Sequence, residues 1–139
     1  MARGGAEALA AVPLFGGLSR RHLKNVAELV REESFEEGAT LAEQGEPGET
    51  FYVILEGAAK VTRGKRTINR LLPGDFFGEI ALIDGGPRTA SVISETPMTT
   101  LTLPRSEFQK VLKQEPSIVV AMLEELARRL RSNERSLTG

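Results

Sequence analysis

Apolar and polar residues follow three successive patterns along this chain: helical, then strand-like, then helical again. Ser19 is a helix N-cap residue, and the stretch after it carries apolar residues at helical spacing. This first stripe consists of Leu23, Val26, Ala27 and Val30. From Arg31 to Leu103, glycines and prolines divide the chain into short pieces, which predicts strands joined by turns.

Two of the predicted strands differ in pattern. The run "TFYVILEG", from Thr50, is continuously apolar and rich in β-branched and aromatic residues, which predicts a strand covered on both faces. The run "MTTLTL", from Met98, instead alternates, with leucines on one face and Thr100 and Thr102 on the other. Many short strands at a spacing of about 8–12 residues favour a sandwich, a barrel or a jelly roll.

After Pro104 the helical period returns. Phe108, Val111 and Leu112 share one face of a helix that Pro116 should end. A proline also suits the first turn of a helix, so a last helix is expected to start there and to run to about Asn133.

Composition narrows the classes of function. A chain of 139 residues with a net charge of −1 predicts one domain with no overall attraction for nucleic acid or anionic lipid. Without cysteine, and with His22 as the single histidine, neither a thiolate site nor a multi-histidine metal site is available. We expect His22 to be a plain residue on a helix surface. The apolar N-terminal stretch around Pro13 is too short to cross a bilayer, which takes about 20 residues, and indicates a packed segment of a cytoplasmic protein.

The stretch "FFGEIALIDGGPRTASV", from Phe76, carries the candidate chemistry. Gly78 lets the backbone approach a ligand closely, and a helical turn that starts near Glu79 would point free N–H groups at an anion. Gly85 and Gly86 can end that turn, and Arg88 offers a planar fork of donors for a phosphate. A carboxylate at position 79 repels phosphate, so it suits a ligand that also carries hydroxyls. A ribose phosphate has both groups.

These residues resemble the phosphate-binding cassette of the cyclic nucleotide-binding domain family, as found in cyclic-AMP receptor proteins, kinase regulatory subunits and gated channels. The cassette pattern matches residues 77–82, Phe-Gly-Glu-Ile-Ala-Leu, and residues 88–90, Arg-Thr-Ala. A second family pattern, glycines around an apolar strand, matches residues 45–57. Ala42 departs from the β-branched residue or cysteine that is usual there, and we expect it to affect packing rather than the ligand.

The resemblance implies a mainly β fold: an eight-stranded jelly roll (double-stranded β-helix) with an N-terminal helix and two C-terminal helices. It also implies that Glu79 accepts from the ribose 2′-hydroxyl and that Arg88 pairs with the phosphate oxygens. The full set of expected ligand-binding residues is Phe77, Gly78, Glu79, Ile80, Ala81, Leu82, Arg88, Thr89, Ala90, Arg129 and Asn133. No cofactor is expected beyond the ligand itself, cAMP or cGMP.

Some alternatives stay open for the cassette. Glu79 and Arg88 could form a structural ion pair with no ligand, since buried pairs are weak evidence for function. Thr89 could be an ordinary strand residue. Its hydroxyl could also reach the amino group of a syn guanine, although the family's cyclic-AMP binders carry threonine there as well. We favour cAMP because no other guanine-binding group stands out.

The last helix carries a second pattern, with apolar residues spaced alternately by four and three positions, as in a coiled-coil seam. The seam consists of Val119, Leu123, Leu126, Leu130, Asn133 and Leu137. It predicts a homodimer, and its likeness to the dimer helix of cyclic-AMP receptor proteins places Arg129 near the ribose and Asn133 near the base. Alternatively, the helix folds back on its own strands through Ile118 and Met122.

Together these patterns predict a single cyclic nucleotide-binding domain over residues 1–139. It divides into an N-terminal helical segment to about residue 30, a β-roll over 31–103 with a cassette at 77–90, and hinge, lid or dimer helices over 104–139. We expect a sensor that moves its last helix on binding and not an enzyme, with no direct contact to DNA or membrane and an effector that the sequence does not name. The alternative is a ligand-free dimerisation domain of a larger regulatory protein.

Overall fold

The structure is a computed structural model that describes residues 9–138, with the side chains of residues 133–138 outside the description. A short 3-10 helix, η1 (Pro13–Phe15), and helix α2 (Arg20–Ala27) precede the strands. Ser19 caps α2, since its hydroxyl accepts from the backbone N–H of His22 at 3.3 Å. The predicted start of this helix is therefore confirmed.

In the described part of the chain eight strands follow, interrupted by one short helix. They are β1 (Arg31–Phe35), β2 (Thr40–Ala42), β3 (Thr50–Glu56), β4 (Ala59–Arg63), β5 (Arg66–Leu71), β6 (Phe76–Phe77), β7 (Ser91–Ser94) and β8 (Met98–Pro104). Helix α3 (Glu79–Asp84) lies between β6 and β7, and helices α4 (Arg105–Gln114) and α5 (Pro116–Thr138) end the chain. The prolines at positions 104 and 116 mark both helix boundaries as predicted.

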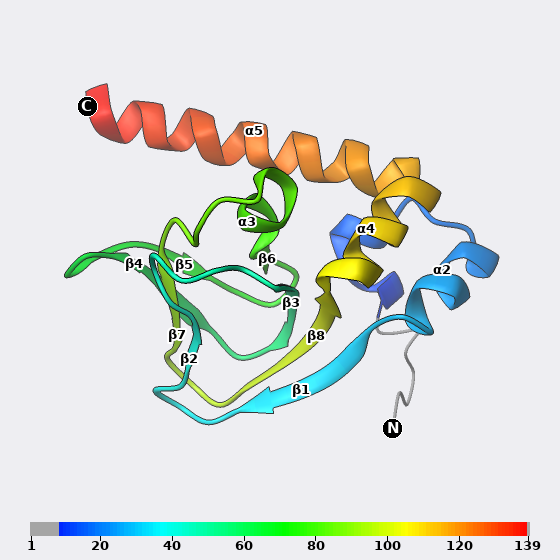
Figure 1. Ribbon diagram of the computed structural model, residues 1–139, viewed down its shortest axis with the longest axis horizontal. Coiled ribbons are helices and arrows are strands. Elements are labelled where there is room, and N and C mark those ends of the chain that lie inside the picture. The colour runs from blue at the N-terminus through cyan, green and yellow to red at the C-terminus, as the bar shows by residue number, and fades with distance from the viewer. Residues whose placement is uncertain (1–8, 139) are drawn as a thin grey trace.

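The strands pair into two four-stranded antiparallel sheets, in the orders β1-β8-β3-β6 and β2-β7-β4-β5. This mainly β architecture with flanking helices matches the expected fold class, and the strand order is consistent with a jelly roll. In Figure 1 the helices gather on one side of the strands, and α5 runs across the molecule above α3.

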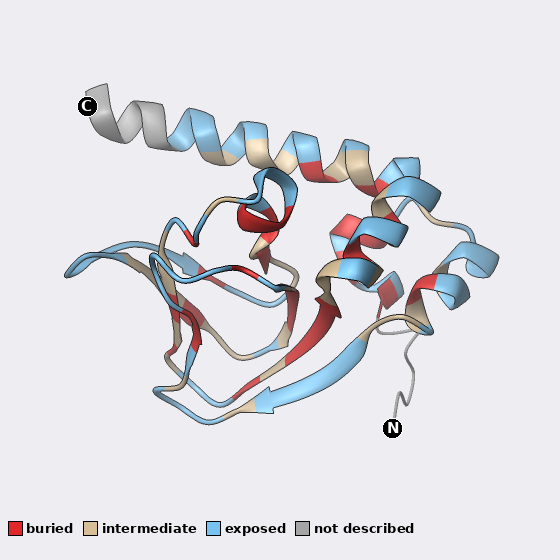
Figure 2. Ribbon diagram, in the orientation of Figure 1, coloured by how far each residue is buried: buried red, intermediate tan, exposed pale blue. Residues whose placement is uncertain are grey.

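Two apolar clusters hold these layers together. One packs the first sheet against the helices around Phe15, Phe51, Phe108 and Ile118, and the other lies between the sheets around Ile54. Strands β3 and β8 belong to both clusters, so both of their faces are covered (Figure 2).

Burial of both faces changes the interpretation of β8. Its residues do alternate, but Thr100 and Thr102 are as buried as the leucines. Their hydroxyls lie 3.4 Å from the carbonyl oxygens of Glu33 and Arg31 on β1, so each buried hydroxyl has an acceptor. The alternation therefore marks two different buried surfaces rather than a buried and a solvated one.

His22 is exposed on α2 but is not a plain surface residue. Its Nδ1 lies 2.7 Å from Oε1 of Glu115, whose side chain is 4% exposed, in the junction between α4 and α5. The predicted position on a helix surface is confirmed, but the contact with Glu115 was not predicted, because this partner lies 93 residues away and no local pattern indicates it. The contact ties the first helix to the point where α5 begins.

The last helix folds back on its own chain through Ile118 and Met122, which are buried against η1 and the helical core. Leu126 of the proposed seam also packs against this core. Leu123 and Leu130 are 61% and 62% exposed, so part of the seam is accessible and part is used within the chain. No helix of the described residues is long and apolar enough to span a bilayer.

Candidate functional site

Two glycines in left-handed backbone geometry frame helix α3. Gly78 (φ +95°) precedes Glu79, the first helical residue, and Gly85 (φ +75°) ends the helix with its N–H bonded to the carbonyl of Ala81. A side chain at either position would strain the backbone, since only glycine adopts positive φ at no steric cost. The predicted turn between the glycines is present, although Gly86 does not take part in the left-handed ending.

Between α3, strands β4 and β5 and helix α5 lies a cavity of about 490 Å³. This volume falls within the usual range of about 300–1,000 Å³ for small-molecule sites. The cavity is lined by most of the predicted ligand residues: Phe77, Gly78, Glu79, Ile80, Ala81, Arg88, Thr89, Ala90 and Arg129. Leu82 is not in the lining and packs into the helical core instead. Asn133, predicted near the base, has its side chain outside the described residues.

The lining also contains residues that the motifs did not indicate. Its apolar members are Ala42, Val61, Ile68, Leu71 and Val92, and its polar members are Asn69, Glu125, Arg128 and Ser132. Ala42 was expected to affect packing alone, but it is both buried and part of the cavity wall. Its small side chain leaves space in the cavity that a β-branched residue would fill.

Arg88 is held at the cavity wall by backbone carbonyls. It is 8% exposed, and its Nη1 and Nη2 donate to the carbonyl oxygens of Gly78 (3.1 Å) and Thr50 (2.8 Å). Burial lowers the pKa of the guanidinium, and nearby Tyr52 and Glu79 partly offset this effect. The two bonds use two of the five N–H donors of an arginine, which leaves three for a ligand.

The position of Arg88 depends on two glycines. A Cβ added at Gly78 would lie 2.7 Å from both Nη1 of Arg88 and the carbonyl oxygen of Thr50. One added at Gly48 would lie 2.5 Å from the Cβ of Ala81 and 3.0 Å from Nε and Cζ of Arg88. A side chain at Gly78 would therefore clash with Arg88 and with one of its acceptors, whereas a side chain at Gly48 would clash mainly with Ala81 of α3 and less severely with Arg88. Gly48 follows Pro47 in a loop that also pairs with Pro87, just before Arg88. Gly48 belongs to the second family pattern, but neither pattern indicated that it packs against Ala81 and Arg88.

Glu79 is a buried carboxylate, 3% exposed, at the start of α3. Its Oε1 has no hydrogen-bond partner, and its Oε2 lies 3.9 Å from Nη1 of Arg129. Desolvation raises the pKa of this carboxyl, while its own backbone N–H, Arg129 and Arg88 act in the opposite direction. Glu79 and Arg88 do not form an ion pair, so the alternative of a structural pair between them is not supported.

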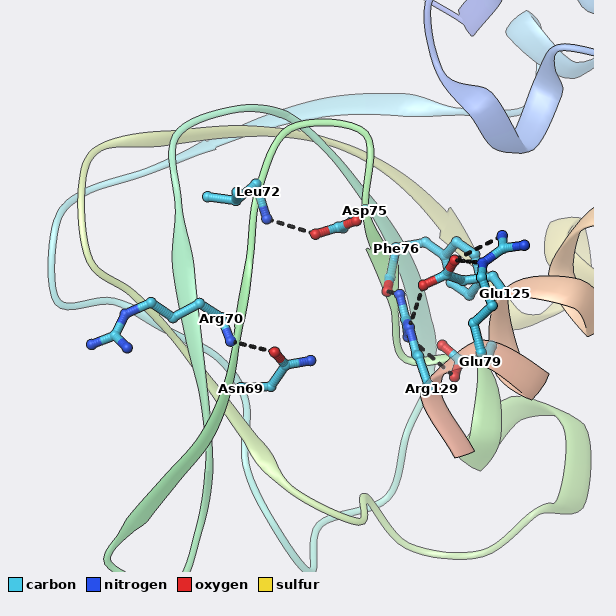
Figure 3. A network of polar contacts seen from close by, with 9 residues as sticks. Asn69, Arg70, Leu72, Asp75, Phe76, Glu79, Glu125 and Arg129 are labelled. Carbon is cyan, nitrogen blue, oxygen red and sulfur yellow. Dashed lines mark hydrogen bonds and ion pairs between the residues drawn. The ribbon is translucent and has the colours of Figure 1, made fainter. Parts of the chain in front are cut away.

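Arg129 connects α5 to the cavity (Figure 3). Its Nη2 donates to the carbonyl oxygen of Phe76 at 2.7 Å, and its Nε donates to Glu125 at 3.1 Å. The guanidinium also lies over the ring of Phe76, 4.5 Å from the centroid, in a cation–π contact. The Arg129 side chain reaches both Glu79 and Phe76 of β6. It therefore links the last helix to the cassette.

The comparison with known proteins agrees with this geometry. The family model "Cyclic nucleotide-binding domain" matches residues 32–115. The chain belongs to the cyclic nucleotide-binding domain family. The chain is similar to a cAMP-dependent protein kinase regulatory subunit of Colletotrichum orbiculare, which is 34% identical over 103 residues. That match covers 73% of this chain and 26% of the relative, so the chain spans about a quarter of that protein's length.

Solved structures of cyclic nucleotide-binding domain proteins have the same fold. The catabolite activator protein of Thermus thermophilus is 28% identical with a TM-score of 0.80, over 91% of this chain and 62% of that one. The regulatory domain of Toxoplasma gondii PKA, crystallised with cAMP, is also 28% identical with a TM-score of 0.80, over 91% of this chain and 49% of that one. The predicted family is thereby confirmed, and the relatives named are regulatory rather than catalytic.

Proposed function

We propose that this cyclic nucleotide-binding domain is a ligand sensor that binds cAMP and accepts cGMP as a second ligand. The observation that carries the proposal is the unpaired Oε1 of Glu79, a buried acceptor beside the cavity. An unpaired buried acceptor costs about 1–3 kcal/mol, and a ribose hydroxyl would supply the missing donor. Arg88 lines the same cavity, where it bonds to the carbonyl of Gly78 next to Glu79, and it has unused N–H groups for a phosphate.

The rest of the cavity suits a base. Val61, Ile68 and Leu71 give it an apolar wall on β4 and β5, away from the charged residues of α3. A ligand with a charged phosphate, a hydroxylated sugar and a flat, largely apolar base therefore meets matching surfaces. The Toxoplasma gondii relative crystallised with cAMP supports this choice of ligand.

The last helix is the part we expect to respond. Arg129 bonds to Phe76 and Glu125 and lies near Glu79, so a ligand that engages Glu79 also changes the surroundings of the arginine. We propose that α5 exchanges between two positions relative to the cavity and that the ligand shifts this equilibrium. The size of the shift is set by how much more tightly the ligand binds one position than the other. The domain would form a homodimer through the exposed part of α5. It would act on an effector in the cytoplasm.

Calorimetric titration with cAMP and cGMP tests the binding. Saturable one-to-one binding supports the proposal, whereas no heat and no change in melting temperature would favour the ligand-free dimerisation domain. Chromatography of the recovered nucleotide separates a sensor from an enzyme, since we expect it unchanged. Hydrogen exchange over residues 116–132 tests the helix, and amide protection that nucleotide leaves unaltered would refute its movement.

A further inference from the structure

The hairpin formed by β4 and β5 carries a concentration of positive charge that the nucleotide cavity does not use. Residues 57–74 contain five basic residues and no acidic one, in a chain whose net charge is −1. We call these five residues the basic hairpin: Lys60, Arg63, Lys65, Arg66 and Arg70. They lie outside the cavity lining, and residues 63–70 are all exposed.

The pairing within this hairpin places like charges next to one another. In the register of β4 and β5, Lys60 lies opposite Arg70, and Arg63 lies opposite Arg66. Like charges directly opposite each other destabilise a pair of strands. Glu95 pairs with Arg70 at 3.1 Å, but among the described residues Lys60 and Arg66 have no ion-pair partner. An anionic surface outside the hairpin would relieve this repulsion.

Negative charge is concentrated on another edge of the same molecule. Residues 32–37 contain four glutamates and no basic residue, in β1 and the turn that follows it. We call these glutamates the acidic edge: Glu32, Glu33, Glu36 and Glu37. All four are exposed, and within the described part of the chain their carboxylates make no ion pair. The acidic edge of one copy is therefore complementary in charge to the basic hairpin of another.

Both charged segments include an edge strand. Among the described strands β1 pairs with β8 alone, and β5 pairs with β4 alone. Figures 1 and 2 show β1 and the hairpin exposed at different edges of the molecule. The outer N–H and C=O groups of such strands can accept a further strand, whose main-chain hydrogen bonds supply affinity.

The signs of the charges determine which of these edges can meet. Charged side chains normally keep edge strands apart, and two β1 strands or two β5 strands would bring like charges together. Pairing β5 of one copy with β1 of a second copy instead brings opposite charges together, which stabilises neighbouring strands. A net charge of −1 adds little overall repulsion between copies.

We propose that the basic hairpin of one copy docks onto the acidic edge of a second copy, with β5 and β1 as neighbouring strands. This contact is heterologous, so each assembled pair keeps one basic hairpin and one acidic edge for further copies. It is separate from the α5 seam and does not depend on which nucleotide the cavity binds. Since β4 and β5 also form one wall of the cavity, the docked copy would lie next to the nucleotide site.

Analytical ultracentrifugation without nucleotide tests this contact, at about 50 and 500 mM NaCl, because salt screens exposed charges. Lys65→Glu with Arg66→Glu reverses part of the hairpin, and Glu32→Lys with Glu33→Lys reverses part of the acidic edge. We expect the wild type to associate at low salt and each double variant to weaken that association at least about tenfold. A mixture of the two variants should restore it, since the intact hairpin of one then meets the intact edge of the other.

Lys24→Glu with Lys113→Glu is the matched control, because it makes the same change of charge on exposed residues of α2 and α4. It should associate as the wild type does. A peptide with the sequence of residues 31–37 tests the wild type itself, since it should compete for the hairpin and reduce association.

Three results would overturn the inference. They are a wild type that shows no salt-sensitive association, a control that loses association as fully as the charge-reversed variants, and a mixture of those variants that stays dissociated. Association that Leu123→Glu with Leu130→Glu abolishes and charge reversal leaves unchanged would assign it to α5 and likewise overturn the docking of the hairpin. Nucleotide binding is measured separately by calorimetry, so none of these results bears on the proposed ligand.

Discussion

Replacing Arg88 by alanine separates its contribution to the stability of the protein from its proposed contribution to nucleotide binding. The side chain donates to the carbonyl oxygens of Gly78 and Thr50, so its loss should destabilise the protein even without nucleotide. Two hydrogen bonds from a charged group, set against the cost of burying that group, give a loss of about 2–4 kcal/mol. A drop in melting temperature alone is therefore not evidence for ligand binding.

The rise in melting temperature on adding nucleotide is the quantity that reports ligand binding. A nucleotide at 100 times its Kd stabilises the folded protein by about 2.7 kcal/mol. For a chain of 139 residues, an unfolding entropy of about 2.1 cal/mol/K per residue converts this to a rise of roughly 9 °C. If Arg88→Ala weakens binding about 100-fold, the same nucleotide concentration equals the new Kd, and the rise falls to about 1–2 °C.

Thermal melting of both proteins, with and without cAMP at that fixed concentration, measures the four temperatures needed. Arg105→Ala is the matched control, because Arg105 donates to the carbonyl oxygen of Gly48 at 2.9 Å but does not line the cavity. It should lower the melting temperature without nucleotide and keep the full ligand-induced rise. An equal rise in wild type and Arg88→Ala would refute the assignment of Arg88 to the phosphate.

Three further predictions concern other parts of the molecule. Burial raises the pKa of the Glu79 carboxyl above its ordinary value of 4.5. The protonated carboxyl therefore contributes its full stabilisation below pH 4.5, and this contribution is lost as the pH rises through the pKa of the folded protein. Glu79→Gln should therefore raise the melting temperature near pH 7 and reduce nucleotide affinity, and a lower melting temperature at that pH would contradict the burial argument. His22→Ala should cost about 1–3 kcal/mol in urea unfolding, because it leaves the buried Glu115 carboxylate without its partner; an unchanged midpoint would show that the contact is not stabilising. If α5 pairs two chains, light scattering should give a dimer that Leu123→Glu with Leu130→Glu converts to a monomer, whereas a monomeric wild type at high concentration would exclude the seam.

Local chemistry accounts for what the sequence predicted well. Ser19 caps a helix, prolines open α5 and close β8, and Gly78 and Gly85 bound α3, because each of these residues restricts or permits particular backbone angles. The family motif added the assignments of Glu79 and Arg88, which the structure places on one cavity.

The features that were missed depend on segments far apart in the chain. The burial of Thr100 follows from the second sheet that covers β8, and the role of Gly48 follows from an arginine 40 positions later. The second half of the lining comes from β4, β5 and α5, whose side chains meet only after the sheets form. An alternating or amphipathic pattern reports that a face is buried but not which surface buries it.

The two glycines beside Arg88 offer a way to disturb the cavity wall without altering the charge of the protein. Alanine at position 48 adds one methyl group and keeps every titratable residue, but its Cβ would lie 2.5 Å from the Cβ of Ala81, so the loop or helix α3 would have to shift. Cells that carry such a protein would contain a domain with the same net charge and the same exposed α5 residues as the wild type. A difference in their response would then report the nucleotide signal alone, separate from any scaffolding role of the domain.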